Sequence, residues 1–304
     1  EACNRLRRCR TNLEVQQTFF YPLLHGIVDR CSDGLVLENS LSVDKRVPHT
    51  FITNHRDIVM DSAFLSISLL DNGFGNTMEI AIGDNLLIRP WIKKLVRVDK
   101  AFIVQRSVSL RQMLASSARL SRYMHYAIAT KHENIWIAQR EGRAKDSNDR
   151  TQDSILKMMA MGGEGSIIDR LKQLNLVPTA LSYEYDPCDY LKAQEFQQKR
   201  DIEGFKKSPK DDLVNMQTGI FGYKGRICFR VAGPLNDWLD TLPADMPKTE
   251  LFTAVASRID KEIHRNYKLY AGNYVAADLL RGTQEFAAHY TSEEKTRFEA
   301  YLES

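Results

Sequence analysis

A histidine stands beside two aspartates in the segment 54–62, which reads Asn-His-Arg-Asp-Ile-Val-Met-Asp-Ser. His55 follows a short β-rich run and precedes an apolar run of helical character, so it is expected where a strand ends and a helix begins. Asp57 is a good N-cap for that helix, and Asp61 lies four residues further along the same helical face. Because helical side chains lean toward the N-terminus, Asp61 can reach back toward the imidazole.

A histidine held by a carboxylate is suited to general-base catalysis. The carboxylate fixes the tautomer of the imidazole and stabilises the imidazolium that forms when it takes a proton. The spacing also fits a plainer interpretation, in which His55 is a turn residue and both aspartates serve the start of the helix. If the histidine is catalytic, its partner is either Asp57 or Asp61.

Basic side chains recur where two further strands are expected to end: Arg106, Arg140, Arg143 and Lys145. A guanidinium group binds phosphate through two parallel hydrogen bonds, and a glycine such as Gly142 lets the backbone approach a ligand closely. This set suits a phosphomonoester. The alternative is a solvated loop with internal ion pairs, because acidic residues are interleaved with the basic ones.

The run from Asn54 to Asp61 resembles the first motif of the glycerophospholipid acyltransferase family, which includes bacterial 1-acyl-sn-glycerol-3-phosphate acyltransferases. That motif is Asn-His, four residues and Asp, whereas here five residues separate His55 from Asp61 and Met60 takes the position of the family's aspartate. The resemblance favours Asp61 as the partner, because the family's aspartate lies inside the helix. Asp57 stays the alternative.

Three further segments resemble later motifs of the family in the same order: 100–106, 139–145 and 176–181. Each is short, but four segments in order across residues 50–185 are fairly specific. The segment 139–145, which resembles the family's third motif, departs from the family pattern. Here Arg143 follows Glu-Gly directly, where the family usually has Thr and then Arg. The resemblance implies that these residues bind the substrate phosphate: Lys100, Arg106, Glu141, Gly142, Arg143 and Lys145.

The same resemblance implies an enzyme of phospholipid biosynthesis that uses no cofactor. It would move a fatty acyl group from a thioester of coenzyme A or acyl carrier protein to a hydroxyl of lysophosphatidate or a related glycerol-phosphate lipid. No G-x-S-x-G nucleophile elbow is present, so an acyl-enzyme is not required. Two other hypotheses are a catalytically silent peripheral membrane-binding module and a lipid thioester or ester hydrolase.

The elements expected around these residues alternate between strand and helix. Strands are expected at 50–53, 79–82, 102–104, 135–138, 177–183 and 226–231, and helices at 10–31, 58–70, 86–95, 110–130, 155–161, 167–174 and 249–267. This alternation predicts an α/β fold with a mixed, mostly parallel sheet flanked by helices. The polar stretch 184–215 is expected to be an exposed helical insertion or a surface loop.

The domain organisation follows from the same pattern. Residues 1–48 are expected to form an N-terminal helical segment, 49–270 the acyltransferase α/β domain and 271–304 a C-terminal helical extension with a cap at Thr291. Four arginines precede the amphipathic helix 10–31. That helix either associates with an anionic membrane or packs on the core.

Composition narrows the possible partners. The 304 residues are 43% hydrophobic and 27% charged, with a net charge of +3, which gives no argument for nucleic acid. No apolar run of about 18 residues and no signal peptide are visible. Five cysteines without C-x-x-C spacing predict neither a metal site nor a disulfide framework. The expected location is peripheral, on the cytoplasmic face of a membrane.

Overall fold

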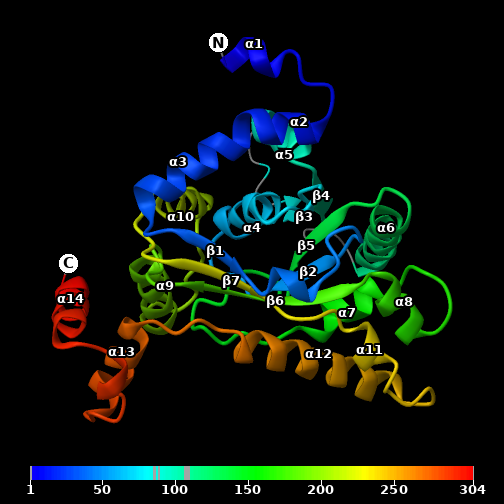
Figure 1. Cartoon of the computed structure of the whole chain (residues 1–304). Helices are drawn as coiled ribbons and strands as arrows, with labels where there is room; N and C mark the ends of the chain where they lie inside the picture. The colour runs from blue at the N-terminus through cyan, green and yellow to red at the C-terminus, as the bar shows by residue number, and fades with distance from the viewer. Residues whose placement is uncertain (1, 85–86, 88–89, 106–109, 304) are drawn as a thin grey trace.

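The fold is one sheet between two layers of helices (Figure 1). The computed structural model describes residues 2–84, 87, 90–105 and 110–303. The strands are β1 (Leu35–Glu38), β2 (Thr50–Thr53), β3 (Met78–Gly83), β4 (Ala101–Val104), β5 (Asn134–Ala138), β6 (Leu176–Tyr183) and β7 (Ile227–Val231). Their order is β1-β7-β6-β2-β5-β3-β4, and only the β6–β7 pair is antiparallel. The predicted α/β fold with a mixed, mostly parallel sheet is confirmed.

Strand β2 lies in the middle of the sheet, between β5 and β6. Its last residue, Thr53, is paired with Ala138 of β5 and Thr179 of β6. The side chain of Asn54 continues this pairing, because its amide donates to the Leu181 carbonyl at 2.9 Å and accepts from the Leu181 N–H at 2.8 Å. The chain therefore leaves the sheet at a fixed point, immediately before His55.

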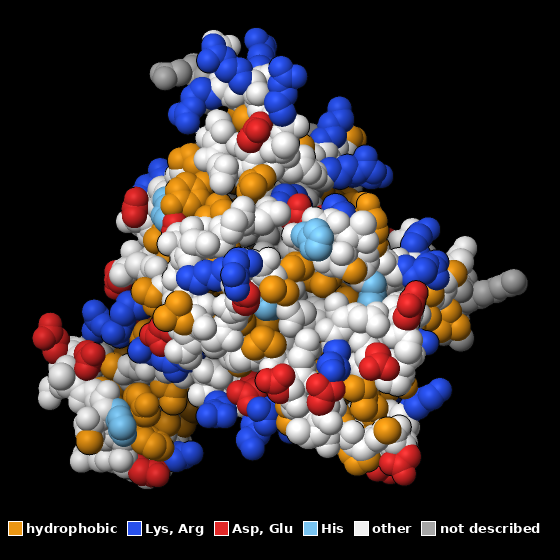
Figure 2. All heavy atoms as spheres, turned by 45° about the vertical axis from the view of Figure 1, so that its right-hand side comes forward, with side chains coloured by type: hydrophobic (Ala, Val, Ile, Leu, Met, Phe, Trp, Pro, Cys, Tyr) orange, Lys and Arg blue, Asp and Glu red, His pale blue; other side chains and the backbone are white. Residues whose placement is uncertain are grey.

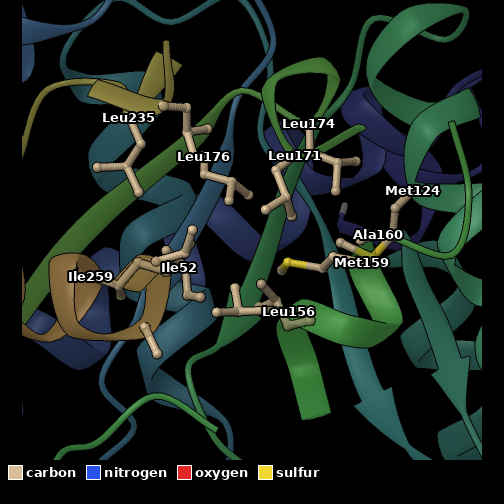
Figure 3. Packing of buried hydrophobic residues seen from close by; sticks show 14 of the residues in the cluster. Ile52, Met124, Leu156, Met159, Ala160, Leu171, Leu174, Leu176, Leu235 and Ile259 are labelled. Atoms are coloured by element: carbon tan, nitrogen blue, oxygen red, sulfur yellow. The ribbon is translucent and has the colours of Figure 1, made fainter. Parts of the chain in front are cut away.

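One face of the sheet is covered by five helices: α6 (Leu110–Ala129), α7 (Asp153–Met159), α8 (Ile167–Gln173), α11 (Asn236–Leu239) and α12 (Lys248–Arg265). Their apolar side chains meet those of the strands in a continuous core. Figure 3 shows Ile52 of β2 beside Leu156 of α7 and Ile259 of α12, all fully buried. This packing buries the isoleucines that β2 and β5 present to this face, Ile52, Ile135 and Ile137.

The other face is covered by α3 (Tyr21–Cys31), α4 (Met60–Asp71), α5 (Pro90–Val98) and α10 (Pro209–Phe221) (Figure 1). The predicted helix 10–31 is instead α2 (Asn12–Val15), a π-helical turn (Gln16–Phe20) and α3. Leu24 and Ile27 are buried against the core, whereas Phe19 and Leu23 are exposed. The segment thus packs on the core with one side and leaves apolar side chains on the other.

Several elements differ from the sequence expectations. Strand β1 was not expected, and it pairs with β7 although it lies within 1–48. The stretch 184–215 contains α9 (Asp189–Asp201) and most of α10, and α10 covers the sheet rather than projecting from it. The expected helix 86–95 lies partly outside the described residues, and α5 begins at Pro90, where proline is favoured as a first helical residue.

Helical segments occupy both ends of the described chain. Helix α1 (Ala2–Leu6) precedes α2, and α13 (Ala271–Arg281) and α14 (Ser292–Glu303) follow α12. Thr291 caps α14 as expected, since its hydroxyl accepts from the Glu294 N–H at 3.1 Å and its own N–H donates to the Glu294 carboxylate at 2.8 Å. The limits of the three predicted domains stay a prediction.

Candidate active site

His55 and Asp61 are in direct contact at the carboxyl end of β2. The His55 Nδ1 lies 2.7 Å from the Asp61 Oδ2, and their side chains are 14% and 1% exposed. Trp136 of β5 packs edge-on against the imidazole, with ring centroids 5.5 Å apart. Because Asp61 takes Nδ1, the nitrogen left to meet a ligand is Nε2. This is the arrangement that a histidine general base requires.

Asp61 is held by more than the histidine. Its carboxylate accepts from the backbone N–H of Arg56 at 2.7 Å and of Asp57 at 3.0 Å, and from the Tyr183 hydroxyl at 3.0 Å. Burial raises the pKa of Tyr183 well above its usual value, and the charges of Asp61 and Asp57 raise it further, so the phenol keeps the proton that it donates. The carboxylate is therefore fixed in position and fully hydrogen-bonded although it is buried.

Asp57 has a different place. Its Oδ1 accepts from the N–H groups of Val59 and Met60 at 2.8 Å each, in the turn that leads into α4. The helix begins at Met60 with Val59 at the N-cap position, two residues later than the sequence suggested, so Asp57 is not its N-cap. Burial raises the pKa of Asp57, and the charge of Asp61 adds to this, against the opposing effect of the two N–H donors and of Arg143. Of the two aspartates that the sequence left open as partners of His55, only Asp61 contacts the ring.

His55 lines a cavity of about 630 Å³ that runs between the sheet and the helices α4, α5 and α10. Its apolar wall comes from all of these elements: Ile58, Val59, Ala63, Ile80, Ile82, Ile92, Leu95, Val96, Met216, Ile220 and Phe221. The polar part of its wall includes Gly142, Arg143, Lys145, Lys207 and Asp212, and Asp99 lies at the end of α5. The cavity thus combines a long apolar wall with the basic residues that follow β5.

Arg143 is a buried guanidinium whose polar contact among the described residues is with an amide. Arg143 is only 9% exposed. Its Nη1 donates to the Asn215 Oδ1 of α10 at 3.2 Å. It forms no ion pair with a described carboxylate. A buried positive charge is unfavourable unless it is paired, and this side chain lines the cavity. An anionic ligand in the cavity would supply the missing partner.

Lys145 also faces the cavity, and it pairs with the Glu195 carboxylate of α9. Burial lowers the pKa of Lys145, and Glu195 opposes this effect. Lys199 pairs with the same carboxylate at 2.8 Å, and the Lys207 Nζ lies 3.9 Å from it. Burial raises the pKa of Glu195, but the hydrogen bonds from Lys145 and Lys199 outweigh burial and hold it at about 2.

The loop after β5 is tied to the residues after β2. The Ala144 N–H donates to the His55 carbonyl at 3.2 Å, and the Arg56 guanidinium pairs with the buried Asp149 through two hydrogen bonds, one of them 3.0 Å long. Gly142 has a φ of +70°, in the left-handed region that favours glycine. These contacts bring Gly142, Arg143 and Lys145 to the same cavity as His55, and their binding of a phosphate stays a prediction.

Lys100 is a correction to the predicted set. It precedes β4, and because β4 runs parallel to its neighbour β3, Lys100 lies at the amino edge of the sheet, opposite the edge that carries His55. Its ammonium donates to Glu133 at 2.9 Å and to Asn76 at 2.5 Å, so its contacts there are internal. Arg106 lies outside the described residues. Glu141 follows β5, but it is not part of the cavity wall.

Sequence reasoning missed three residues of this site: Tyr183, Trp136 and Lys207. Tyr183 is the last residue of β6, so its strand-end position was an available signal, whereas Trp136 lies in the middle of β5 and carried none. No signal in the polar stretch 184–215 marked Lys207. In the part of the chain that the structure describes, no three His, Cys, Asp or Glu side chains gather as metal ligands, and no helix is long and apolar enough to cross a bilayer.

The fold and the site together define an α/β protein that carries a histidine–aspartate pair at the carboxyl edge of a mostly parallel sheet. No family model matches the chain, and no curated protein matches it. Among solved structures, it is similar to the 1-acyl-sn-glycerophosphate (LPA) acyltransferase PlsC from Thermotoga maritima, with a TM-score of 0.50, 11% sequence identity and coverage of 88% of this chain and 89% of that chain. This likeness shows that the chain shares the fold of an acyltransferase.

Proposed function

We propose that this protein is an acyltransferase that moves a fatty acyl group from a thioester to a hydroxyl of lysophosphatidate or a related glycerol-phosphate lipid. The observation that carries the proposal is the cavity of about 630 Å³. It places the His55–Asp61 pair between a long apolar wall and a buried Arg143 that forms no ion pair with a described carboxylate. An acyl chain needs the apolar wall, an acceptor phosphate needs the guanidinium, and the reacting hydroxyl needs the base between them.

In the proposed reaction, His55 Nε2 takes the proton from the acceptor hydroxyl as its oxygen attacks the thioester carbonyl. Asp61 holds the ring through Nδ1 and stabilises the imidazolium that forms. The tetrahedral intermediate then collapses, the carbon–sulfur bond breaks, and the imidazolium returns the proton to the leaving thiolate. The products are an ester and a free thiol, so no acyl-enzyme is formed and the histidine is regenerated.

The tetrahedral intermediate carries a negative oxygen that needs hydrogen-bond donors. The loop after β5 offers two, because the N–H groups of Gly142 and Arg143 make no hydrogen bond to a described residue, whereas Glu141 and Ala144 on either side donate to Gln152 and His55. Gly142 lines the cavity, and a Cβ at this position would contact nothing within 4 Å. We propose these two N–H groups as the oxyanion donors.

We further propose that the enzyme acts at the cytoplasmic surface of a membrane, where its acceptor would lie. Four exposed arginines support this location: Arg5, Arg7, Arg8 and Arg10. Figure 2 shows Lys and Arg side chains gathered over this N-terminal end of the molecule, and Phe19 and Leu23 are exposed nearby along the chain. Basic and apolar side chains together bind anionic leaflets. Sedimentation with phosphatidylglycerol vesicles, but not with phosphatidylcholine vesicles, would support the proposal; equal partition would contradict it.

The test of the function is turnover of an acyl thioester with lysophosphatidate, followed by release of free thiol. Wild type should turn over only when the acceptor is present, and His55→Ala should lose about 10²–10⁴-fold in rate because general-base catalysis contributes this much. Coenzyme A and acyl carrier protein thioesters are compared as donors in separate reactions. Release of free fatty acid without an acceptor would indicate a hydrolase instead, and activity in His55→Ala equal to wild type would disprove the mechanism.

A further inference from the structure

The segment that joins α9 to α10 brings a third cation to the basic end of the cavity. Lys207 lies between these helices, in the stretch that the sequence suggested was an exposed insertion, and its side chain is 22% exposed. It pairs with Asp212 on α10, and its Nζ is 3.9 Å from the Glu195 carboxylate that also holds Lys145. The two lysines are therefore neighbours, although 62 positions separate them in the numbering.

The ammonium groups of Lys145 and Lys207 each have N–H donors that bind no described residue. A lysine carries three N–H donors. Lys145 makes one hydrogen bond, to Glu195, and Lys207 makes one, to Asp212, among the described residues. Arg143 has five donors and uses one for Asn215. Since all three side chains line the cavity, their remaining donors are available to a ligand inside it.

The charges at this end of the cavity also favour an anion. Three cations line it, Arg143, Lys145 and Lys207, and the carboxylates that pair with the two lysines are Glu195 and Asp212. The charge of Arg143 is matched by no ion pair with a described carboxylate. A phosphomonoester carries about −1.5 to −2 at neutral pH. The head group of a zwitterionic lysolipid has no net charge, because an ammonium group balances its negative phosphodiester.

We infer that Lys207 binds the acceptor phosphate together with Arg143 and Lys145, so that the α9–α10 segment selects a phosphomonoester over a neutral or zwitterionic acceptor. This inference rests on the proposed function for the identity of the acceptor. Lys207 would bind the group that the acceptor carries and would take no part in the proton transfer at His55. Its contribution is therefore to acceptor binding rather than to the rate of the bound complex.

Lys199 provides a matched control. It pairs with the same Glu195 carboxylate as Lys145, but it is 51% exposed and is not part of the cavity wall. Removing either Lys199 or Lys207 takes one positive charge from the surroundings of Glu195. Only the removal of Lys207 takes a donor from the cavity.

The experiment measures the binding of short-chain lysophosphatidate and of the matching neutral monoacylglycerol by calorimetry, alongside the KM and kcat of transfer. In Lys207→Ala we expect the Kd and the KM for the phosphate ligand to rise about 10-fold or more, because a hydrogen bond to a charged group is lost. The Kd for the neutral ligand and the kcat should stay within about 3-fold. Lys207→Arg should restore most of the affinity, and Lys199→Ala should match wild type.

The results separate this inference from the proposed function. Wild type that binds lysophosphatidate through Lys207 without transferring an acyl group would leave the phosphate site intact and disprove the acyltransferase. The inference is overturned if Lys207→Ala binds the phosphate ligand as tightly as Lys199→Ala, if both ligands weaken equally in Lys207→Ala, or if wild type shows no preference for the phosphate ligand.

Discussion

The decisive perturbation of the site is Asp61→Asn, compared with Asp57→Asn as its matched control. Both changes replace a buried carboxylate by an amide of the same shape near the start of α4. Asn at position 61 can keep its carbonyl oxygen toward His55, Arg56 and Asp57, while its amide donates to the hydroxyl of Tyr183, which then rotates. The fold should therefore survive, and the negative charge beside the imidazole is what disappears.

The magnitude follows from the geometry. At the 2.7 Å separation of His55 Nδ1 and Asp61 Oδ2, two unit charges at an effective dielectric of 20 attract by about 6 kcal/mol. This is the largest stabilisation that Asp61 can give to an imidazolium formed in the transition state, and it corresponds to about 10⁴-fold in rate. We expect Asp61→Asn to lower kcat by about 10²–10⁴-fold with little change in KM, because the charge acts only once the proton has moved.

The control predicts a different result. Asp57 makes no contact with the ring, and the side-chain oxygen of Asn can accept from the same Val59 and Met60 N–H groups, so Asp57→Asn should keep kcat within about 10-fold. The assay is the acceptor-dependent release of thiol, with thermal unfolding measured for each variant to show that both are folded. A folded Asp61→Asn with near-wild-type kcat, or a loss in Asp57→Asn as large as that in Asp61→Asn, would refute the assignment of Asp61 as the partner of His55.

Two further predictions concern stability. Burial raises the pKa of Asp99 from 3.8 to about 6, so the folded chain holds the Asp99 proton more tightly than the unfolded chain does. The free energy of unfolding should therefore fall by up to about 3 kcal/mol as the pH rises from 4 to 7. Urea unfolding should show that Asp99→Asn removes this fall; an unchanged slope with pH would contradict the prediction. At Gly219 a Cβ would lie 1.8 Å from the Asp57 Oδ2, so Gly219→Ala should destabilise by about 1–3 kcal/mol, whereas Gly233→Ala, with nothing within 4 Å, should be nearly neutral. Equal melting temperatures of these two glycine variants would argue against close docking of α10 on the start of α4.

Part of the site could be predicted because it depends on short stretches of chain. Asp61 lies in the first turn of α4, and its side chain reaches back six positions to His55, as the sequence suggested. The expected N-cap at Asp57 was wrong by two residues, because α4 begins at Met60. Lys100 lies apart from the other predicted phosphate-binding residues for a physical reason. It directly precedes β4, and because a strand extends by about 3.3 Å per residue, the start of β4 lies at the opposite edge of the sheet from its end.

Other parts depend on contacts that no local pattern encodes. Tyr183 donates to Asp61 across 122 positions, and Arg143 to Asn215 across 72, because β6 and β5 pair with β2 and α10 covers the sheet. The polar sequence of 184–215 suggested exposure, yet α10 lines the cavity with one face. Its first turn is charged, and its apolar residues lie on more than one side of the helix, so only the docked helix shows which of them face the cavity.

The sequence by itself determined the alternation of strands and helices, the loop that carries His55, and the presence of basic residues after β5. Hydrophobic periodicity and the signals that start and end a helix depend on neighbouring residues, so both can be recognised in the sequence. Tertiary structure alone decided the order of the strands, the hydrogen bond from Tyr183 to Asp61, and the approach of Lys207 to Lys145. These three features depend on the free energy of packing distant segments together. Many side chains contribute to that free energy, so no single stretch of the sequence predicts it.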